Sequence, residues 1–337
     1  MDPLLAFIHQ FPLGVSPGEI ERALAIPRTT LNRQLNTAVD QGRIRRLGRG
    51  AATRYQSADP HVALRAYFER PYTERPLARF DERRLDPTPG LPLDRLQVLP
   101  SEVTHILDRR ELAKFLIDFS CASSLLEGGT YSFLDTQALL DYGEPAEGKP
   151  LADAFLVLNH KDAFEYLYDH MSLDSIFEVH ARLTNDHARP ELKNAPHFLE
   201  KDFRGVVREF TDIDIAQSTY MPPFRPGTGY LGRALEQILE TSKQIDHPLQ
   251  AAFYLMTRIA YLQPFKDGNK RTSRAICNVP LIQAQMPPIS FVEFNKHDYI
   301  ISMLAFYELG DLSLAATSFL SGYQKSIARL RVNPKPS

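Results

Sequence analysis

The segment Gln263–Arg274 has the residue types and spacing of a site for phosphate groups. An apolar helix is expected to end near Leu262, and a new helix to begin at about Arg271 after a loop that contains Gly268. The free N–H groups and the positive dipole end of such a helix start attract anions. Asp267 is placed to hold a magnesium ion, because Mg²⁺ prefers one or two carboxylates plus substrate oxygens. Three cations add positive charge: Lys270, Arg271 and Arg274.

The same residues also fit a plainer structure, a capped helix behind a solvated basic turn. A glycine loop before a helix is a weak signal by itself. An acid, Asn269 and three cations within eight residues favour the phosphate site instead. Arg271 and Arg274 share one face of the expected helix, and an arginine can bind phosphate oxygens through two hydrogen bonds at once.

The sequence QPFKDGNKRTSR at 263–274 resembles the signature of the Fic family, H-x-F-x-D/E-G-N-G-R-x-x-R. The sequence VREFTDIDIAQSTYMPPF resembles the flap that aligns the target segment in that family. The segment Ser123–Gly128 fits the inhibitory motif S/T-x-x-x-E-G/N. The likeness covers about Ser101 to Gln324, and many family members also carry a winged-helix appendage. Six signature positions match in register: Phe265, Asp267, Gly268, Asn269, Arg271 and Arg274.

The resemblance implies transfer of AMP from ATP, with Mg²⁺, to a hydroxyl on a side chain of a target protein. Asp267 would hold the metal, and Phe265 would anchor the loop in the core. The phosphates would be held by the residues that follow: Gly268, Asn269, Lys270, Arg271 and Arg274.

The inhibitory motif consists of Ser123, Glu127 and Gly128. In the family's scheme Glu127 pairs with Arg274, displaces the γ-phosphate of ATP and so restrains the enzyme. This pairing is chemically sensible, because a carboxylate fits the same guanidinium fork as a phosphate. The alternative is that Glu127 is an ordinary acid at a helix end beside Gly128.

Two departures from the signature bear on function. Gln263 stands where the family has the histidine that takes the proton of the target hydroxyl. Glutamine cannot act as a general base, and loss of that role typically lowers the rate by about 10²–10⁴-fold. Lys270 replaces the second glycine, as in the Doc-like branch, whose members transfer a phosphate instead of AMP.

Three classes of function therefore stay open. The first is a slow or unconventional AMP-transferase. The second is an inactive nucleotide sensor whose state is read out on DNA as a transcriptional regulator. The third is a Doc-like phosphotransferase or an AMP-removing enzyme, in which Glu127 activates water. The four other histidines considered are interpreted as packed or surface residues: His160, His170, His180 and His247.

The N-terminal segment is strongly basic. Between Arg28 and Arg54 there are seven arginines and one acid, a net charge of +6, so the rest of the chain carries −8. Such asymmetry indicates a polyanion-binding end. The order helix, helix, helix, basic hairpin predicts a winged helix-turn-helix. The alternative to DNA binding is a winged helix that docks a protein and whose arginines only keep it soluble. The candidate DNA contacts are Thr30, Asn32, Arg33, Arg43, Arg45, Arg46, Arg49 and Arg54.

These elements predict a mainly α chain: a Fic-like helical bundle with a small β-hairpin flap, behind a winged helix-turn-helix domain. We expect the winged helix at 1–57, a proline-rich connecting arm at 58–100 and the Fic-like domain at 101–337. Within that domain lie an inhibitory helix at about 110–127, the flap at about 208–229 and the motif at 263–274.

The bulk composition fits a cytoplasmic protein. The hydrophobic fraction is 43% and the charged fraction 24%, as in ordinary globular proteins. Two cysteines, far apart, make no disulfide framework, which favours a reducing cytosol. No signal peptide is recognised, and no apolar run approaches the roughly 18 residues that cross a bilayer. The expected partners are ATP, a target protein and DNA, without a membrane; a pair of DNA half-sites would require a homodimer.

Overall fold

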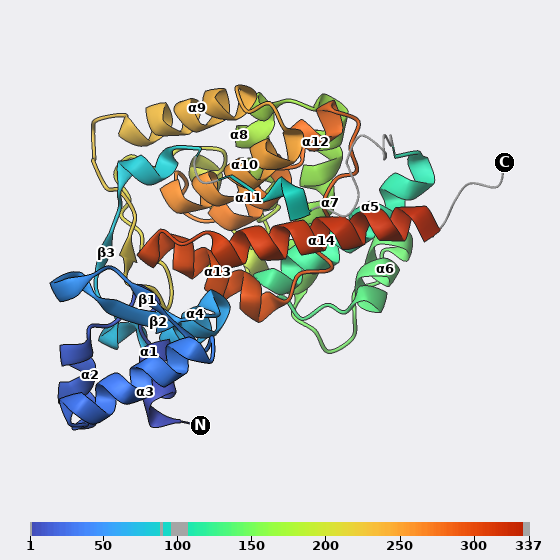
Figure 1. The fold of residues 1–337 in the computed structure, drawn as a ribbon. Coiled ribbons are helices and arrows are strands. Elements are labelled where there is room, and N and C mark those ends of the chain that lie inside the picture. Colours follow the sequence, from blue (N-terminus) through green and yellow to red (C-terminus); the bar gives the residue numbers. More distant parts are fainter. Residues whose placement is uncertain (1, 88–89, 96–106, 333–337) are drawn as a thin grey trace. The chain divides into compact units, whose positions relative to one another are not determined.

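A computed structural model describes residues 2–87, 90–95 and 107–332 (Figure 1). Backbone contacts divide the chain into two compact units. The first comprises Met1–Ala78, Ile215–Tyr220 and Ile300–Ala315, and the second comprises Arg79–Asp214, Met221–Tyr299 and Ala316–Ser337. The domain boundaries expected at residues 57 and 100 stay predictions, and the second of them lies outside the described residues.

The first unit begins with three helices and a hairpin, in the predicted order. The helices are α1 (Pro3–His9), α2 (Pro17–Leu24) and α3 (Arg28–Asp40), and the antiparallel strands are β1 (Ile44–Leu47) and β2 (Arg54–Ser57). Helix α2 begins with a capping box, in which Ser16 and Glu19 bond each other's backbone N–H groups. One apolar cluster joins all five elements, and its fully buried members include Ile8, Val15, Ile20, Leu31 and Leu35.

The rest of the first unit is held by a short helix and a buried ion pair. Helix α4 (Pro60–Phe68) places Leu64 against Ile301 and Leu314. Arg75 donates two hydrogen bonds, of 2.9 and 3.0 Å, to the carboxylate of Glu308. The same carboxylate accepts bonds from Ser218 and from the backbone of Thr219, so it fixes the segment 215–220 within this unit.

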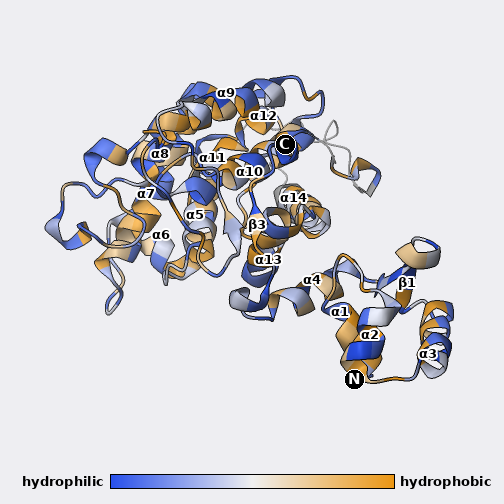
Figure 2. Cartoon of the chain, turned by 90° about the vertical axis from the view of Figure 1, so that its left-hand side faces the viewer, coloured by the Kyte–Doolittle hydropathy of each residue, from blue (hydrophilic) through white to orange (hydrophobic). Residues whose placement is uncertain are grey.

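The second unit contains the helical bundle. Helix α10, coloured mainly as hydrophobic in Figure 2, lies inside it, and thirteen of its residues are buried. Figure 1 shows α9 along one edge of this unit. Helix α13 (Lys296–Leu309) begins in the second unit and continues in the first, whereas α14 (Ser313–Val332) begins in the first and continues in the second. The remaining helices are α5 (Arg109–Leu126), α6 (Phe133–Tyr142), α7 (Leu151–His170), α8 (Ile176–Leu183), α9 (Tyr230–Lys243), α10 (Pro248–Leu262), α11 (Asn269–Ile276), α12 (Val279–Gln283), α13 (Lys296–Leu309) and α14 (Ser313–Val332).

The mainly helical prediction is confirmed, with differences in detail. The helix expected to begin at about Arg271 is divided into α11 and α12, because Pro280 has no backbone N–H to continue the helical hydrogen bonds. Helix α6 was not predicted, although its capping box of Ser132 and Asp135 is a local signal for it. The flap's strand β4 (Tyr220–Met221) pairs with β3 (Ala78–Arg79), not with another part of the flap.

Candidate functional site

The loop between α10 and α11 is shaped by the side chain of Asn269. Its Oδ1 accepts the N–H of Phe265 at 2.8 Å, and its Nδ2 donates to the carbonyl of Phe265 and to Oε1 of Gln263, both at 2.9 Å. The amide of Asn269 therefore holds the loop and is not free to bind phosphate. What the loop offers an anion is its backbone, because the first N–H groups of α11 have no partner inside the helix.

Gln263 is a structural brace at the end of α10. Its backbone is left-handed, with φ of 54°, and its Nε2 donates to the carbonyl of Ala260 at 2.7 Å. Since Oε1 already accepts from Asn269, both ends of the amide are engaged. The side chain thus supports the loop and has no group that could take a proton.

Phe265 and His180 fix the loop through stacked rings and a hydrogen bond to its backbone. Phe265 is fully buried, and its ring stacks on that of His180 with 3.9 Å between centroids. The N–H of Gly205 donates to Nδ1 of His180, so the ring carries its proton on Nε2 and donates it to the carbonyl of Asp267 at 2.9 Å. Burial lowers the pKa of His180 to about 4, which keeps the ring neutral. His180 is buried, as one of the two predicted alternatives had it, but its hydrogen bond to the loop was not predicted.

Gly268 lies where only glycine fits. Its φ is 76°, and a Cβ there would stand 2.9 Å from Cγ2 of Thr184. We expect Gly268→Ala to lower the free energy of unfolding by about 1–3 kcal/mol, because the strained backbone and the clash add. Urea denaturation measures this, with Gly232→Ala as the control, since its Cβ meets nothing within 4 Å. Equal stability of the two variants would contradict the prediction.

Arg271 links the loop to a second segment. It is 1% exposed; Nη1 donates to the carbonyls of Leu183 and His197, both at 3.0 Å, and Nη2 donates to Oδ2 of Asp267 at 3.0 Å. The side chain of Asp267 is 49% exposed, and its other oxygen has no hydrogen bond in the described structure. Arg271 therefore orients the acid, while Asp267 keeps one oxygen available to a ligand.

Arg274 and Glu127 form the buried ion pair that the inhibitory motif implies. Nη2 of Arg274 lies 2.7 Å from Oε1 of Glu127, and neither side chain is more than 10% exposed. Lys270 lies 3.9 Å from the other carboxylate oxygen. Burial alone would raise the pKa of Glu127, but the charges of Arg274, Lys270 and Arg271 outweigh it, so the pKa lies well below its usual range.

Three further hydrogen bonds hold Arg274. Nε donates to the hydroxyl of Ser123 at 3.0 Å, Nη2 also donates to the carbonyl of Ser123, and Nη1 donates to the hydroxyl of Tyr299. Tyr299 was missed by the sequence analysis, because no motif joins it to residue 274. Gly128, with φ of 101°, turns the chain after Glu127 at the end of α5.

Arg208 fastens the base of the flap to the loop. Its Nε donates to the carbonyl of Gln263 and its N–H to that of Pro264, at 2.8 and 2.9 Å. Its guanidinium also reaches the carbonyls of Thr211 and Pro223, on the two arms of the flap. Sequence reasoning assigned it no role, although it lies within the flap motif.

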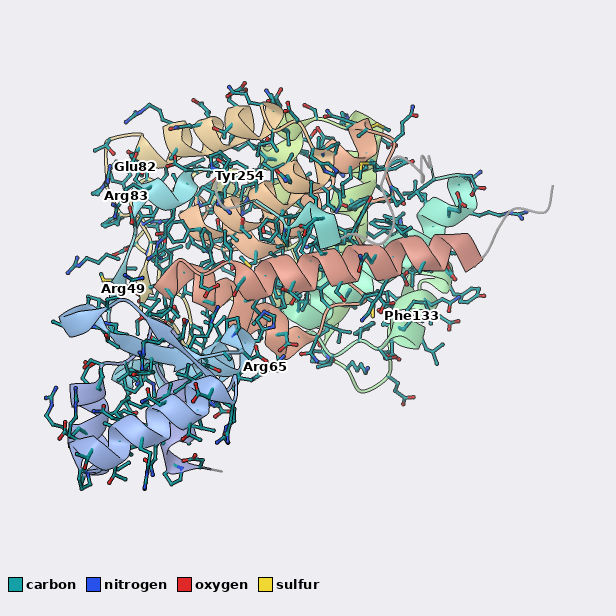
Figure 3. All side chains as sticks on the ribbon, in the orientation of Figure 1. Arg49, Arg65, Glu82, Arg83, Phe133 and Tyr254 are labelled. Atoms are coloured by element: carbon teal, nitrogen blue, oxygen red, sulfur yellow. The ribbon has the colours of Figure 1, made fainter. Side chains whose placement is uncertain are left out.

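The residues predicted to contact DNA lie on α3 and the hairpin. Thr30 is half-buried, whereas Asn32 and Arg33 are exposed on α3. Arg49 lies at the turn between β1 and β2 (Figure 3). Arg46 bonds Asn36 at 2.7 Å, and Arg54 bonds the carbonyl of Gly14 at 3.0 Å. The exposed arginines of the hairpin are Arg43, Arg45, Arg46, Arg49 and Arg54.

Comparisons with known proteins agree with this geometry. Residues 170–281 match the Fic/DOC family. The chain is 26% identical over 185 residues to Protein adenylyltransferase Fic of Nematostella vectensis and 26% identical over 200 residues to Protein adenylyltransferase fic-1 of Caenorhabditis elegans. These alignments cover 52% and 56% of this chain, but only 40% and 35% of the relatives.

Two solved structures share the fold. The structure of Fic-1 (residues 134–508) from C. elegans has a TM-score of 0.52 and 23% identity, over 70% of this chain and 68% of that one. A Fic family protein from Desulfovibrio desulfuricans has a TM-score of 0.54 and 18% identity, over 73% and 72%. Among the helices described here, none is both long and apolar enough to span a membrane. Residues 170–281 of this chain are therefore a Fic/DOC family domain.

Proposed function

We propose that this domain transfers AMP from ATP to a hydroxyl on another protein and that Glu127 restrains the transfer. The observation that carries the proposal is the buried Arg274–Glu127 pair beside the loop of the motif. A guanidinium held by a carboxylate is a ready phosphate site once the carboxylate leaves, because both anions use the same fork. Relatives named protein adenylyltransferases support ATP as the substrate and a protein as the target.

The loop has the groups that a triphosphate needs. The start of α11 offers backbone N–H groups, and Lys270, 39% exposed, adds a cation at the rim. Once Glu127 leaves, Arg274 becomes available for the outermost phosphate. Arg271 acts here chiefly by holding Asp267, because all its bonds go to protein oxygens.

The residues present fit a magnesium ion brought in with ATP. No group of three or more His, Cys, Asp or Glu side chains gathers among the residues that the structure describes, so the protein does not build a complete metal cage there. Asp267 has one oxygen without a hydrogen bond, and Mg²⁺ typically uses one or two carboxylates plus phosphate oxygens. When bound, the ion would neutralise charge that develops on the phosphates.

The decisive experiment follows label from α-³²P-ATP and γ-³²P-ATP, separately, into the proteins of a cell lysate. It uses the wild type, Glu127→Gly, Gln263→His and the double variant. Transfer of α-label by the wild type or by Glu127→Gly supports AMP transfer. Transfer of γ-label alone would support the Doc-like alternative instead. If only the Gln263→His variants transfer label, the natural domain is a nucleotide sensor and the proposal is wrong.

We propose a second activity, binding of nucleic acid by the N-terminal helices and hairpin. The exposed arginines of the hairpin support it, above all Arg45 and Arg49, whose guanidinium groups have no hydrogen-bond partner among the described residues. Fluorescence anisotropy with duplex DNA should show log K falling linearly with log salt, with a slope of about −0.9 per phosphate neutralised. Arg45→Ala/Arg49→Ala should make this slope shallower, whereas Lys114→Ala, which removes an exposed lysine of α5, should not. An unchanged slope in the arginine variant would favour a protein-docking role.

The homodimer and the cytoplasmic location stay predictions.

Cys121 and Cys277 are free and buried, and burial raises the pKa of both thiols, so neither is reactive in this structure.

A further inference from the structure

The loop that runs from Asn185 to Leu199 is held in a conformation that most residues avoid. A β-bridge joins Asn185 to Leu199, and the N–H of Leu199 donates to the carbonyl of Thr184 at 2.9 Å, so the loop is closed at its base. Such backbone geometry persists only where the surrounding structure enforces it, and it gathers at functional sites. Four non-glycine residues of the loop have positive φ: His187, Ala188, Asn194 and His197.

Arg271 enforces this conformation at His197. Its Nη1 donates to the backbone carbonyl of His197, and its Nη2 donates to the carboxylate of Asp267, both at 3.0 Å. One buried guanidinium therefore joins the loop to the acid of the motif. The base of the loop is fixed as well, since Nδ2 of Asn159 donates to the carbonyl of Asn185 at 2.8 Å.

The ring of His197 differs from the other two histidine rings at the site. Both nitrogens of His180 are hydrogen-bonded, and His160 is fully buried with Nδ1 against the carbonyl of Leu156 at 2.6 Å. His197 is half-buried, and no hydrogen bond reaches its ring in the part of the chain that the structure describes. It keeps a ring nitrogen open to a substrate.

Charges on both sides act on this ring. Burial and then Arg271 lower the pKa of His197, while the nearby carboxylates of Glu127, Asp267 and Asp153 act to raise it. The net effect lowers the pKa of His197 below its usual value, which favours the neutral imidazole, the form that accepts a proton. The geometry agrees, because the guanidinium of Arg271 bonds both the backbone of His197 and the carboxylate of Asp267.

Resting on the proposed AMP transfer, we propose that His197 takes the proton of the attacking hydroxyl, the role that Gln263 cannot perform. The hydroxyl oxygen of the target forms a bond to the α-phosphorus of ATP. The bond from that phosphorus to the bridging oxygen breaks, and pyrophosphate leaves with the electron pair. The hydroxyl proton passes to the open ring nitrogen of His197, which becomes an imidazolium and later releases the proton to water.

The test compares three proteins: Glu127→Gly, Glu127→Gly/His197→Asn and Glu127→Gly/His170→Asn. Asparagine is chosen because it tolerates positive φ and keeps the backbone carbonyl that Arg271 binds. His170, exposed at the end of α7, controls for the substitution itself. We expect the His197 variant to transfer α-label about 10²–10⁴-fold more slowly with an unchanged Kd for ATP, and the His170 variant to behave as its parent.

A second readout does not depend on activity. Diethyl pyrocarbonate should modify His197 of the wild-type protein, and saturating ATP with Mg²⁺ should protect it, as followed by mass spectrometry of its peptide. Equal transfer by the His197 variant, a loss of ATP affinity instead of rate, or modification that ATP does not slow would each overturn the inference and leave AMP transfer standing. Absence of transfer in Glu127→Gly itself would overturn AMP transfer, and the inference with it.

Discussion

Glu127→Gly is expected to bind ATP about 10–150-fold more tightly than the wild type. The carboxylate of Glu127 occupies the fork of Arg274 through a charge-assisted hydrogen bond of 2.7 Å. Such a bond is typically worth about 1.5–3 kcal/mol, and ATP must displace it in the wild type. Isothermal titration with ATP and Mg²⁺ measures the difference.

The matched control is Glu144→Gly, which removes an exposed glutamate in the loop after α6. Its affinity for ATP should equal that of the wild type. If both variants, or neither, bind ATP more tightly, then Glu127 does not compete with the nucleotide. The result is independent of catalysis, so it also applies if the natural domain is a sensor.

Arg274→Met is expected to lower the free energy of unfolding by about 3–5 kcal/mol. It removes one member of a buried pair and leaves the carboxylate of Glu127 without its closest partner, with Lys270 3.9 Å from its other oxygen, and breaking a buried pair in this way is costly. The double variant Glu127→Leu/Arg274→Met should recover most of the loss, because no buried charge then stays unpaired. Urea denaturation of the four proteins measures this, and additive losses in the double variant would show that the pair is not coupled.

The contribution of this pair should depend on pH in a defined direction. The pKa of Glu127 is depressed in the folded state relative to its usual value near 4.5. A depressed carboxyl pKa stabilises the fold above the unfolded pKa, and this stabilisation is lost as the pH falls through the folded value. The difference in stability between wild type and Glu127→Gln should therefore be full at pH 7 and shrink in acid below about pH 4.

The sequence predicted the local parts of the site well. The apolar helix expected to end near Leu262 is α10, and the motif predicted the loop and the helix start that follow it. The resemblance to the Fic inhibitory motif implied that Glu127 pairs with Arg274, and the two side chains are bonded although 147 positions separate them. These predictions succeeded because each depends on residues within one short segment or on a family pattern.

The parts that were missed depend on contacts between distant segments. No sequence spacing marks the following hydrogen bonds: Arg274 to Tyr299, Arg208 to the carbonyl of Gln263, and Arg271 to the carbonyl of His197. Asn269 shows a different limit: its type fits a phosphate ligand, but the fold engages its whole amide in the loop. Residue type alone could not decide between these uses.

The buried Arg274–Glu127 pair has a consequence for the lifetime of the protein in a cell. Under the proposed restraint, any signal that frees Glu127 leaves the buried guanidinium of Arg274 without its carboxylate partner. An activated molecule without nucleotide would unfold more often and be degraded sooner, since a change of 1–2 kcal/mol can alter abundance several-fold. ATP restores the lost contact and stabilises the folded state by mass action. The amount of active protein would then follow the cell's energy supply, without any dedicated control of its synthesis.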